Sequence, residues 1–251
     1  MRTVFLALNL LLLLSFVHSE SVPEKTSTDT IYEKKITEAI SELGKQNFSK
    51  ALSLAEEAEK LKPDNSSAAN LKGRIYIEQK DFPKALEIFT KLATQSPDNI
   101  GAQYNLAEAI FAQGKLSEAR EKFSKVLETV KALPKDQENK LPFGPITQDF
   151  LTYKIYLTYV FEENLVEAKK QLDKFDPYAT SPLYYFGCAA MEFANKNNLK
   201  AMEWIGSASK IYDPSLLELF SNAFFDKGWI RRGSKPGEIA TDLGPPVEKK
   251  P

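Results

Sequence analysis

The sequence predicts an all-α protein, an α-solenoid of about five helix-turn-helix repeats with a C-terminal capping helix. Two observations carry this prediction: apolar residues recur at helical spacing, and the paired-helix pattern returns after about 34 residues. In the segment 66–99, Ala69, Gly73 and Tyr76 fall at i, i+4 and i+7, so they share one face of a first helix. Residues 85, 89 and 92 repeat that spacing in a second helix, which Pro97 ends because proline cannot continue the hydrogen-bond ladder.

The apolar residue that opens the second helix of each pair sets the period. Its positions, separated by 34, 34, 49 and 34 residues, are Phe48, Phe82, Leu116, Leu165 and Leu199. Three residues later stand Ala51, Ala85, Ala119, Ala168 and Met202, and alanine lets two helices approach closely. A helix-turn-helix unit of about 34 residues is the tetratricopeptide period. The chain therefore resembles the tetratricopeptide repeat family from about residue 32 to residue 215.

The resemblance extends to individual positions of the repeat. The small residue expected at the eighth place is met by Gly73, Ala107 and Ala190, whereas Tyr156 departs from it. The large residue expected at the eleventh place is met by Tyr76, Ile110, Tyr159 and Phe193. The family resemblance implies that stacked units form a superhelix whose first helices line a concave, partner-binding groove.

The N-terminal residues read as a targeting segment. Arg2 precedes an apolar run over residues 4–17, and Val17-His18-Ser19 supplies the short residues that a signal peptidase reads. Residues 1–19 are therefore predicted to be a signal peptide that directs the chain to the periplasm or the extracellular space. The alternative is a membrane anchor, but the run is shorter than the roughly 20 residues that a spanning helix needs, so we expect no stable transmembrane anchor after cleavage.

The remaining boundaries follow from composition and period. Residues 134–148 hold three prolines and a glycine, which interrupt the repeats; this insertion is either a surface loop or a loop that covers or extends the groove. The predicted segments are a disordered leader at 20–31, repeats one to three at 32–133, the Pro-rich insertion at 134–148, repeats four and five at 149–215, the capping helix at 216–230 and a disordered tail at 231–251.

The residue inventory argues against catalysis. The only histidine, His18, leaves with the signal peptide, so Ser-His and Cys-His nucleophiles are excluded from the mature chain. One cysteine and no histidine make a zinc site improbable, no phosphate-binding glycine motif is present, and we expect no cofactor. Cys188 cannot form an internal disulfide; it is either buried or paired with another chain. The formal net charge of −1 gives no attraction to nucleic acid.

Transfer of the family's groove positions to this sequence gives the candidate site. Asn70 and Arg74 lie at i and i+4, as do Tyr104 and Glu108, so each pair shares a helix face. The predicted groove residues are Asn70, Arg74, Tyr104, Glu108, Phe111, Tyr153 and Leu157. They suit an extended or helical peptide, or a protein partner. The alternative is that the tyrosines only pack between repeats.

The leading interpretation is an exported, non-enzymatic repeat protein that mediates protein-protein or peptide binding. One alternative is a cell-envelope glycan-acting enzyme that uses a carboxylate pair, with Glu162 and Glu163 as candidates, although adjacent residues do not face each other on a helix. Another is a scaffold component that self-assembles through the ends of the solenoid.

Overall fold

The computed structural model describes residues 26–141 and 143–231. The predicted signal peptide, most of the predicted leader and nearly all of the predicted tail lie outside these residues. Within them the chain forms twelve α-helices and one short 3-10 helix, and no strand. The predicted all-α class is confirmed.

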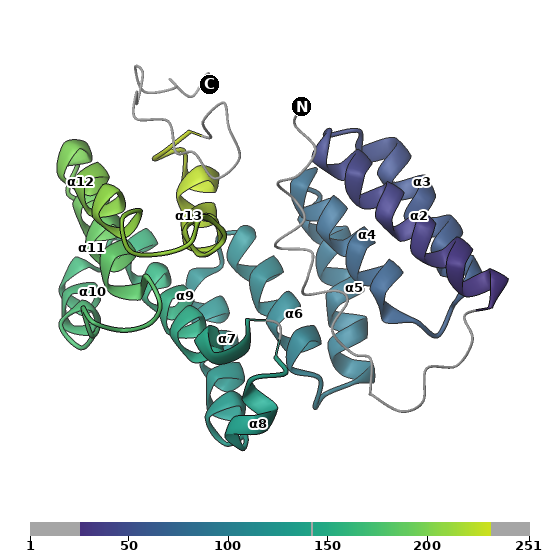
Figure 1. The fold of residues 1–251 in the computed structure, drawn as a ribbon, viewed down its shortest axis with the longest axis horizontal. Coiled ribbons are helices and arrows are strands. Elements are labelled where there is room, and N and C mark those ends of the chain that lie inside the picture. Colours follow the sequence, from purple (N-terminus) through teal and green to yellow (C-terminus); the bar gives the residue numbers. More distant parts are fainter. Residues whose placement is uncertain (1–25, 142, 232–251) are drawn as a thin grey trace. The chain divides into compact units, whose positions relative to one another are not determined.

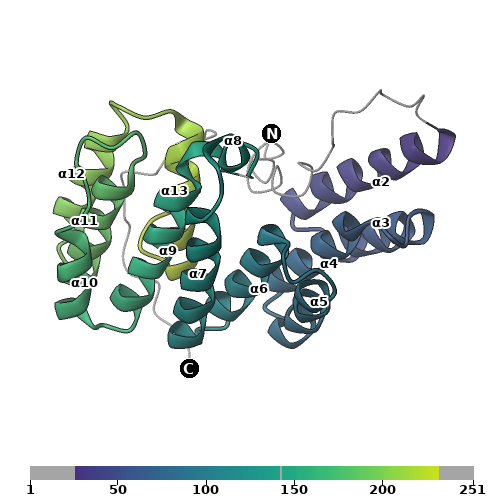
Figure 2. The same cartoon turned by 90° about the horizontal axis from the view of Figure 1, so that it is seen from below.

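The chain divides into two compact units, residues 1–145 and residues 146–251, and each is described by itself. Unit 1 holds three antiparallel helix pairs that follow one another along the chain (Figures 1 and 2). Its helices are α2 (Ser27–Gly44), α3 (Phe48–Leu61), α4 (Ser66–Glu78), α5 (Phe82–Gln95), α6 (Ile100–Ala112), α7 (Leu116–Lys131) and the short α8 (Lys135–Glu138).

Polar caps fix where the helices of unit 1 begin. Thr26 and Asp29 form a capping box, in which the Thr26 hydroxyl accepts from the Asp29 N–H and the Asp29 carboxylate accepts from the Thr26 N–H. Because of this cap, α2 begins at Ser27. The last five residues of the predicted disordered leader are therefore helical, and the boundary at residue 31 was wrong. Asn65 and Asn99 cap α4 and α6 in the same way, each through its side-chain oxygen.

The close approach of paired helices in unit 1 depends on small residues. Ala51, Ala85 and Ala119 have no exposed surface. Gly73 on α4 lies against the ring of Phe89 on α5, and a Cβ added to Gly73 would stand 2.5 Å from the Cζ of Phe89. The aromatic ring therefore fills the space that a side chain at position 73 would need.

Every helix pair turns through one residue in the left-handed region. These residues are Gln46, Lys80, Gly114, Glu163 and Lys196, with φ between 60° and 84°. A fully buried alanine follows five residues later in each pair; the five are Ala51, Ala85, Ala119, Ala168 and Ala201. The last two turns are therefore 33 residues apart, one fewer than the predicted step.

This shift corrects the register predicted for the fifth repeat. Ala201, and not Met202, is the small residue at the helix contact, and Leu199, predicted as the apolar anchor, is 83% exposed. Likewise the buried residue at the twenty-fourth place is Ile205 and not Gly206.

Unit 2 holds two helix pairs and a fifth helix (Figure 1). Its helices are α9 (Thr147–Phe161), α10 (Leu165–Leu172), α11 (Leu183–Ala194), α12 (Asn198–Ala208) and α13 (Pro214–Lys227). Since α9 begins at Thr147, the last two residues of the predicted insertion belong to a helix. The helix α13 begins two residues earlier than predicted and ends at Gly228, whose φ of 74° suits a glycine C-cap.

The helix α13 packs on the first helices of both pairs in unit 2. Phe220 lies 5.3 Å from Phe150 of α9, and Phe224 lies 5.7 Å from Phe186 of α11, both between ring centroids. Trp229 then folds back between the two helices, at 5.3 Å from both Phe161 and Phe193. The predicted capping helix thus completes the core of unit 2 over the faces of α9 and α11.

Candidate functional site

The predicted groove residues fall into both units. Asn70 and Arg74 lie on α4, and Tyr104, Glu108 and Phe111 lie on α6, all in unit 1. Tyr153 and Leu157 lie on α9 in unit 2. The two groups have different surroundings.

The α9 residues are part of the core of unit 2. Tyr153 is 1% exposed and Leu157 is not exposed at all. The Tyr153 hydroxyl donates to the carbonyl oxygen of Phe220 at 2.9 Å, and the two rings lie 4.9 Å apart. Because α13 covers this stripe, Tyr153 and Leu157 present no surface to a partner, and their accessibility was predicted wrongly. The other reading, in which the tyrosine packs, describes Tyr153.

The α4 and α6 residues come together at one place. The Nδ2 of Asn105 donates to the Oδ1 of Asn70 at 2.9 Å and links the two first helices. Asn105 is not among the predicted groove residues, although it follows Tyr104 directly. Its spacing of 35 residues from Asn70, one repeat plus one residue, is the signal that identifies it.

Tyr104 connects the charged members of this cluster. Burial raises the pKa of its hydroxyl well above the usual value, a hydrogen bond and the charge of Glu108 act in the same direction, and the positive charge of Arg74 opposes them. These effects require Arg74 and Glu108 to lie near the Tyr104 hydroxyl. Asn70, Asn105, Arg74, Glu108 and Tyr104 are called the α4/α6 cluster below.

The ring of Tyr104 is held from two sides. It lies 6.0 Å from Phe123 of α7 and 5.6 Å from Phe143 of the insertion, and the residue is 7% exposed. Part of the insertion therefore covers the first-helix face, as one of the two readings of this loop proposed. Phe111, the remaining candidate on α6, lies 6.1 Å from Phe123 and packs within its own helix pair.

The chemistry of the α4/α6 cluster suits a peptide backbone. The bond between the two asparagines uses one N–H of Asn105 and one lone pair of Asn70, which leaves the amide nitrogen of Asn70 and the amide oxygen of Asn105 for another molecule. One donor and one acceptor are what the C=O and N–H of an extended chain require. Arg74 and Glu108 add one charge of each sign.

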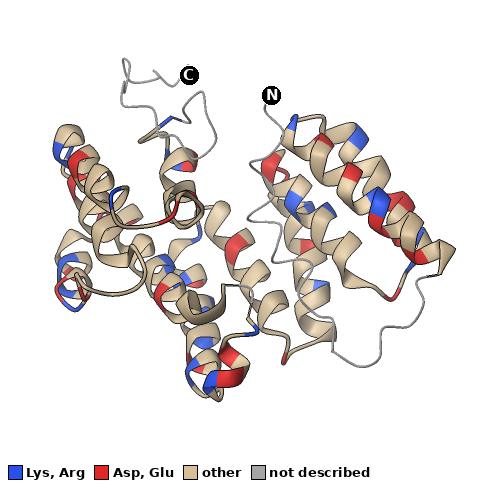
Figure 3. Cartoon of the chain, viewed as in Figure 1, with Lys and Arg blue, Asp and Glu red and all other residues tan. Residues whose placement is uncertain are grey.

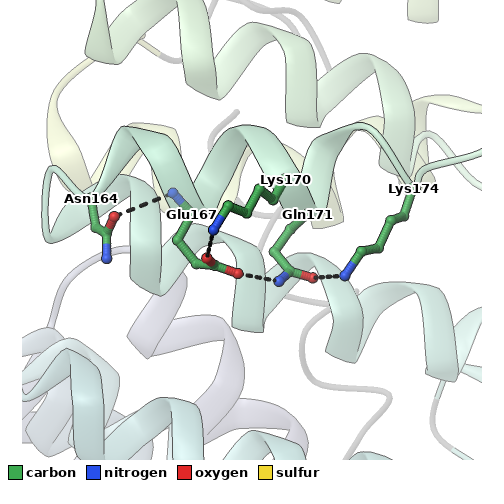
Figure 4. A network of polar contacts seen from close by, with 5 residues as sticks. All are labelled: Asn164, Glu167, Lys170, Gln171 and Lys174. Carbon is green, nitrogen blue, oxygen red and sulfur yellow. Dashed lines mark hydrogen bonds and ion pairs between the residues drawn. The ribbon is translucent and has the colours of Figure 1, made fainter.

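The carboxylates proposed for the enzymatic alternative lie at a turn. Glu163 is the left-handed residue between α9 and α10, and Glu162 precedes it. Figure 4 shows the nearby network on α10, in which Glu167 accepts from the Gln171 amide and the Lys170 ammonium through different oxygens. Gln171 and then Lys170 hold the pKa of Glu167 below its usual value. This network stabilises a solvated helix face, and Figure 3 shows charges of both signs interspersed along the helices.

Two searches over the described residues bear on other functions. No three or more His, Cys, Asp or Glu side chains are grouped so that they would hold a metal ion. None of the described helices combines the length and the hydropathy needed to cross a membrane. Cys188 is free and buried, at 8% exposure, and burial raises the pKa of its thiol.

Comparison with known proteins supports the repeat assignment. Residues 36–100 and residues 76–135 each match a tetratricopeptide repeat family model. The structure is similar to a thermophilic TPR protein of Thermus thermophilus, with a TM-score of 0.50 at 18% identity over 77% of this chain and 99% of that one. It is also similar to Pseudomonas aeruginosa pilF, with a TM-score of 0.52 at 13% identity over 81% and 89% of the two chains. At these identities the likeness shows the fold alone. No curated protein is a significant match.

Proposed function

Because the chain belongs to the tetratricopeptide repeat family through residues 36–135, we propose that it is an exported, non-enzymatic protein that binds a peptide segment of a partner protein at the α4/α6 cluster. The observation that carries the proposal is the Asn105–Asn70 hydrogen bond, which brings two consecutive first helices together around Arg74 and Glu108. Side chains from two different repeats therefore act on one ligand.

The chemistry of the cluster narrows the partner to an extended segment. The two carboxamides pair with its backbone, and the opposite charges of Arg74 and Glu108 fix its direction by pairing with charged side chains or a terminus. The role of Tyr104 is to position these groups, since its ring is packed between Phe123 and Phe143.

Export rests on the N-terminal sequence. The basic residue, the apolar run over 4–17 and the short residues at 17–19 predict cleavage after Ser19. Expression in a host with a secretory pathway, followed by mass spectrometry of the exported protein, tests this directly. The expected N-terminus is Glu20; retention of residues 1–19 in a membrane fraction would favour the anchor.

Binding is tested by crosslinking. A photoreactive amino acid at position 70 or 105 is expected to capture a protein from the exported fraction, and the same amino acid at Lys91, exposed on α5, is the control. The captured protein is then purified and titrated with wild-type chain and with Asn70→Ala, Asn105→Ala and Arg74→Gln. Each substitution is expected to weaken binding by about 1–3 kcal/mol, with the helical circular dichroism unchanged.

Two results would contradict the proposal. One is equal capture from positions 70, 105 and 91, which indicates adventitious contact. The other is unchanged affinity for Asn70→Ala and Arg74→Gln in chains that unfold at the wild-type denaturant concentration, which places the partner elsewhere.

A further inference from the structure

Unit 2 carries a second group of aromatic side chains that does not belong to its core. Tyr184 and Tyr185 lie on α11, Trp204 lies on α12, and Tyr212 follows α12. Trp204 lies 5.8 Å from Tyr184 and 6.1 Å from Tyr185, and Tyr185 lies 5.9 Å from Tyr212, between ring centroids. All four are partly exposed, whereas the aromatics packed around α13 are mostly buried.

The loop between α10 and α11 extends this group. The Tyr212 hydroxyl donates to the carbonyl oxygen of Ala179 at 2.9 Å and fixes the loop beside the rings. In the same loop Tyr178 is 91% exposed, and its N–H donates to the Asp176 carboxylate at 2.9 Å. Tyr178, Tyr184, Tyr185, Trp204 and Tyr212 are called the aromatic patch below.

The charge beside the aromatic patch is negative. After burial and Tyr185, the groups that raise the pKa of the Tyr212 hydroxyl are Asp176 and Asp149, and both carry negative charge. Asp149 lies at the start of α9 and accepts from the Ser181 hydroxyl at 2.6 Å. The nearby Lys169 is already paired with Asp173.

We propose that the aromatic patch, with Asp149 and Asp176 at its edge, binds an arginine side chain of a basic partner segment. The guanidinium is planar and weakly hydrated, and it binds against aromatic faces within about 6 Å of the ring centroid. The two carboxylates supply the charge complementarity that a purely apolar patch lacks. This site lies entirely in unit 2 and does not depend on the α4/α6 cluster.

The patch offers substitutions that separate charge from structure. Asp149→Asn and Asp176→Asn each keep the side-chain oxygen that accepts from Ser181 or from the Tyr178 N–H. The double variant therefore removes two charges while the hydrogen bonds remain. Trp204→Leu removes one ring. Asp64→Asn, at an exposed position of unit 1, is the matched control.

The test uses the full chain and the probe Ac-Gly-Arg-Gly-NH2, with the citrulline peptide as a neutral probe of the same shape. The readout is the indole N–H resonance of Trp204, assigned by its loss in Trp204→Phe. The arginine peptide is expected to shift this resonance saturably, and the citrulline peptide is expected not to. The double aspartate variant should bind the arginine peptide about two- to fivefold more weakly, with Asp64→Asn unchanged.

A second readout covers the ring variant, which has no Trp204 resonance. The tyrosine ring resonances of unit 2, followed in Trp204→Leu, should report binding about two- to fivefold weaker than in the wild type. Equal binding of the citrulline peptide, wild-type affinity of the double aspartate variant, or no saturable shift up to the solubility of the peptide would each overturn the proposal.

Discussion

Gly73 lies against the ring of Phe89, so that a Cβ at position 73 would stand 2.5 Å from the Cζ of Phe89. The first and second helices of this repeat are in contact through that ring. Gly73→Ala is therefore expected to lower the free energy of unfolding by about 1–3 kcal/mol through overpacking, measured by urea denaturation. Gly206→Ala is the control, since a Cβ there meets nothing within 4 Å; it should raise stability by roughly 0.5–1 kcal/mol. A stabilised Gly73→Ala would show that Phe89 moves freely.

The left-handed turn residues predict a pair of opposite effects. Lys80 has a φ of 61° and Gly114 has a φ of 84° at the equivalent turn. Lys80→Gly should raise the free energy of unfolding by about 0.5–1 kcal/mol, because relief of the left-handed strain exceeds the added chain entropy. Gly114→Ala should lower it by about 1 kcal/mol. Equal signs for the two substitutions would refute this account of the turns.

The corrected register of the fifth repeat gives a third prediction. Ala201 has no exposed surface, and Leu199 is 83% exposed. Ala201→Leu is expected to cost about 1–3 kcal/mol of stability, whereas Leu199→Ser should change it by less than about 0.5 kcal/mol. Thermal unfolding of both variants checks this. The reverse ranking would restore the 34-residue register.

Tyr153 and α13 give a fourth prediction. Tyr153→Phe removes the hydrogen bond to Phe220 and leaves a buried carbonyl without that donor, at a cost of about 1–3 kcal/mol. Tyr153→Ala also removes the ring and should cost about 3–5 kcal/mol. Denaturant unfolding measures both. The folded fraction of each variant should bind the partner as the wild type does, and a specific loss of affinity would show that Tyr153 takes part in binding.

Acid should weaken α2 through Asp29. A hydrogen bond from Lys62, followed by hydrogen bonds from Thr26, lowers the pKa of Asp29 from 3.8 to about 2. A carboxylate whose pKa is depressed by folding stabilises the protein above its unfolded pKa. That contribution is lost as the pH falls from about 4 to about 2.

Asp29→Asn should accordingly lower the unfolding midpoint at pH 7 and flatten its decline below pH 4. The measurement is a series of thermal unfolding curves from pH 2 to pH 7. Asp98→Asn, at an exposed inter-repeat position, is the control. A wild-type pH profile for Asp29→Asn would exclude this ion pair as the cause.

Periodicity predicted the helix pairs because each pair buries the same positions, and an alanine or a large ring at those places leaves a visible repeat. It failed in the fifth repeat because one residue is absent from the spacing. Another signal in the sequence carries the correct register. Glu42 accepts from Asn47 at 3.0 Å and pairs with Lys50, and Glu192 accepts from Asn197 at 2.9 Å and pairs with Lys200.

These two turn motifs are 150 residues apart at each position, whereas the predicted anchors Phe48 and Leu199 are 151 apart. The polar contacts of the turn thus record the register that the apolar pattern obscures.

The candidate site was predicted in part for a similar reason. Helix spacing places Asn70 and Arg74 on one face, and Tyr104 and Glu108 on another, because these relations are local. The burial of Tyr153 and Leu157 depends on a helix more than 50 residues later in the chain, and the periodicity of α9 carries no information about it. The contact of Phe143 with Tyr104 is likewise set by an irregular loop.

The aromatic contacts of α13 also determine when unit 2 can finish folding. A ribosome makes α9 and α11 before it makes Phe220, Phe224 and Trp229, so the faces of these helices stay uncovered until the C-terminal residues have emerged. A chain cut short by a premature stop codon before residue 214 would display Phe150, Tyr153 and Phe186 to chaperones and proteases. For this protein the end of synthesis, and not the addition of each repeat, is the step that separates a chain marked for degradation from one that persists.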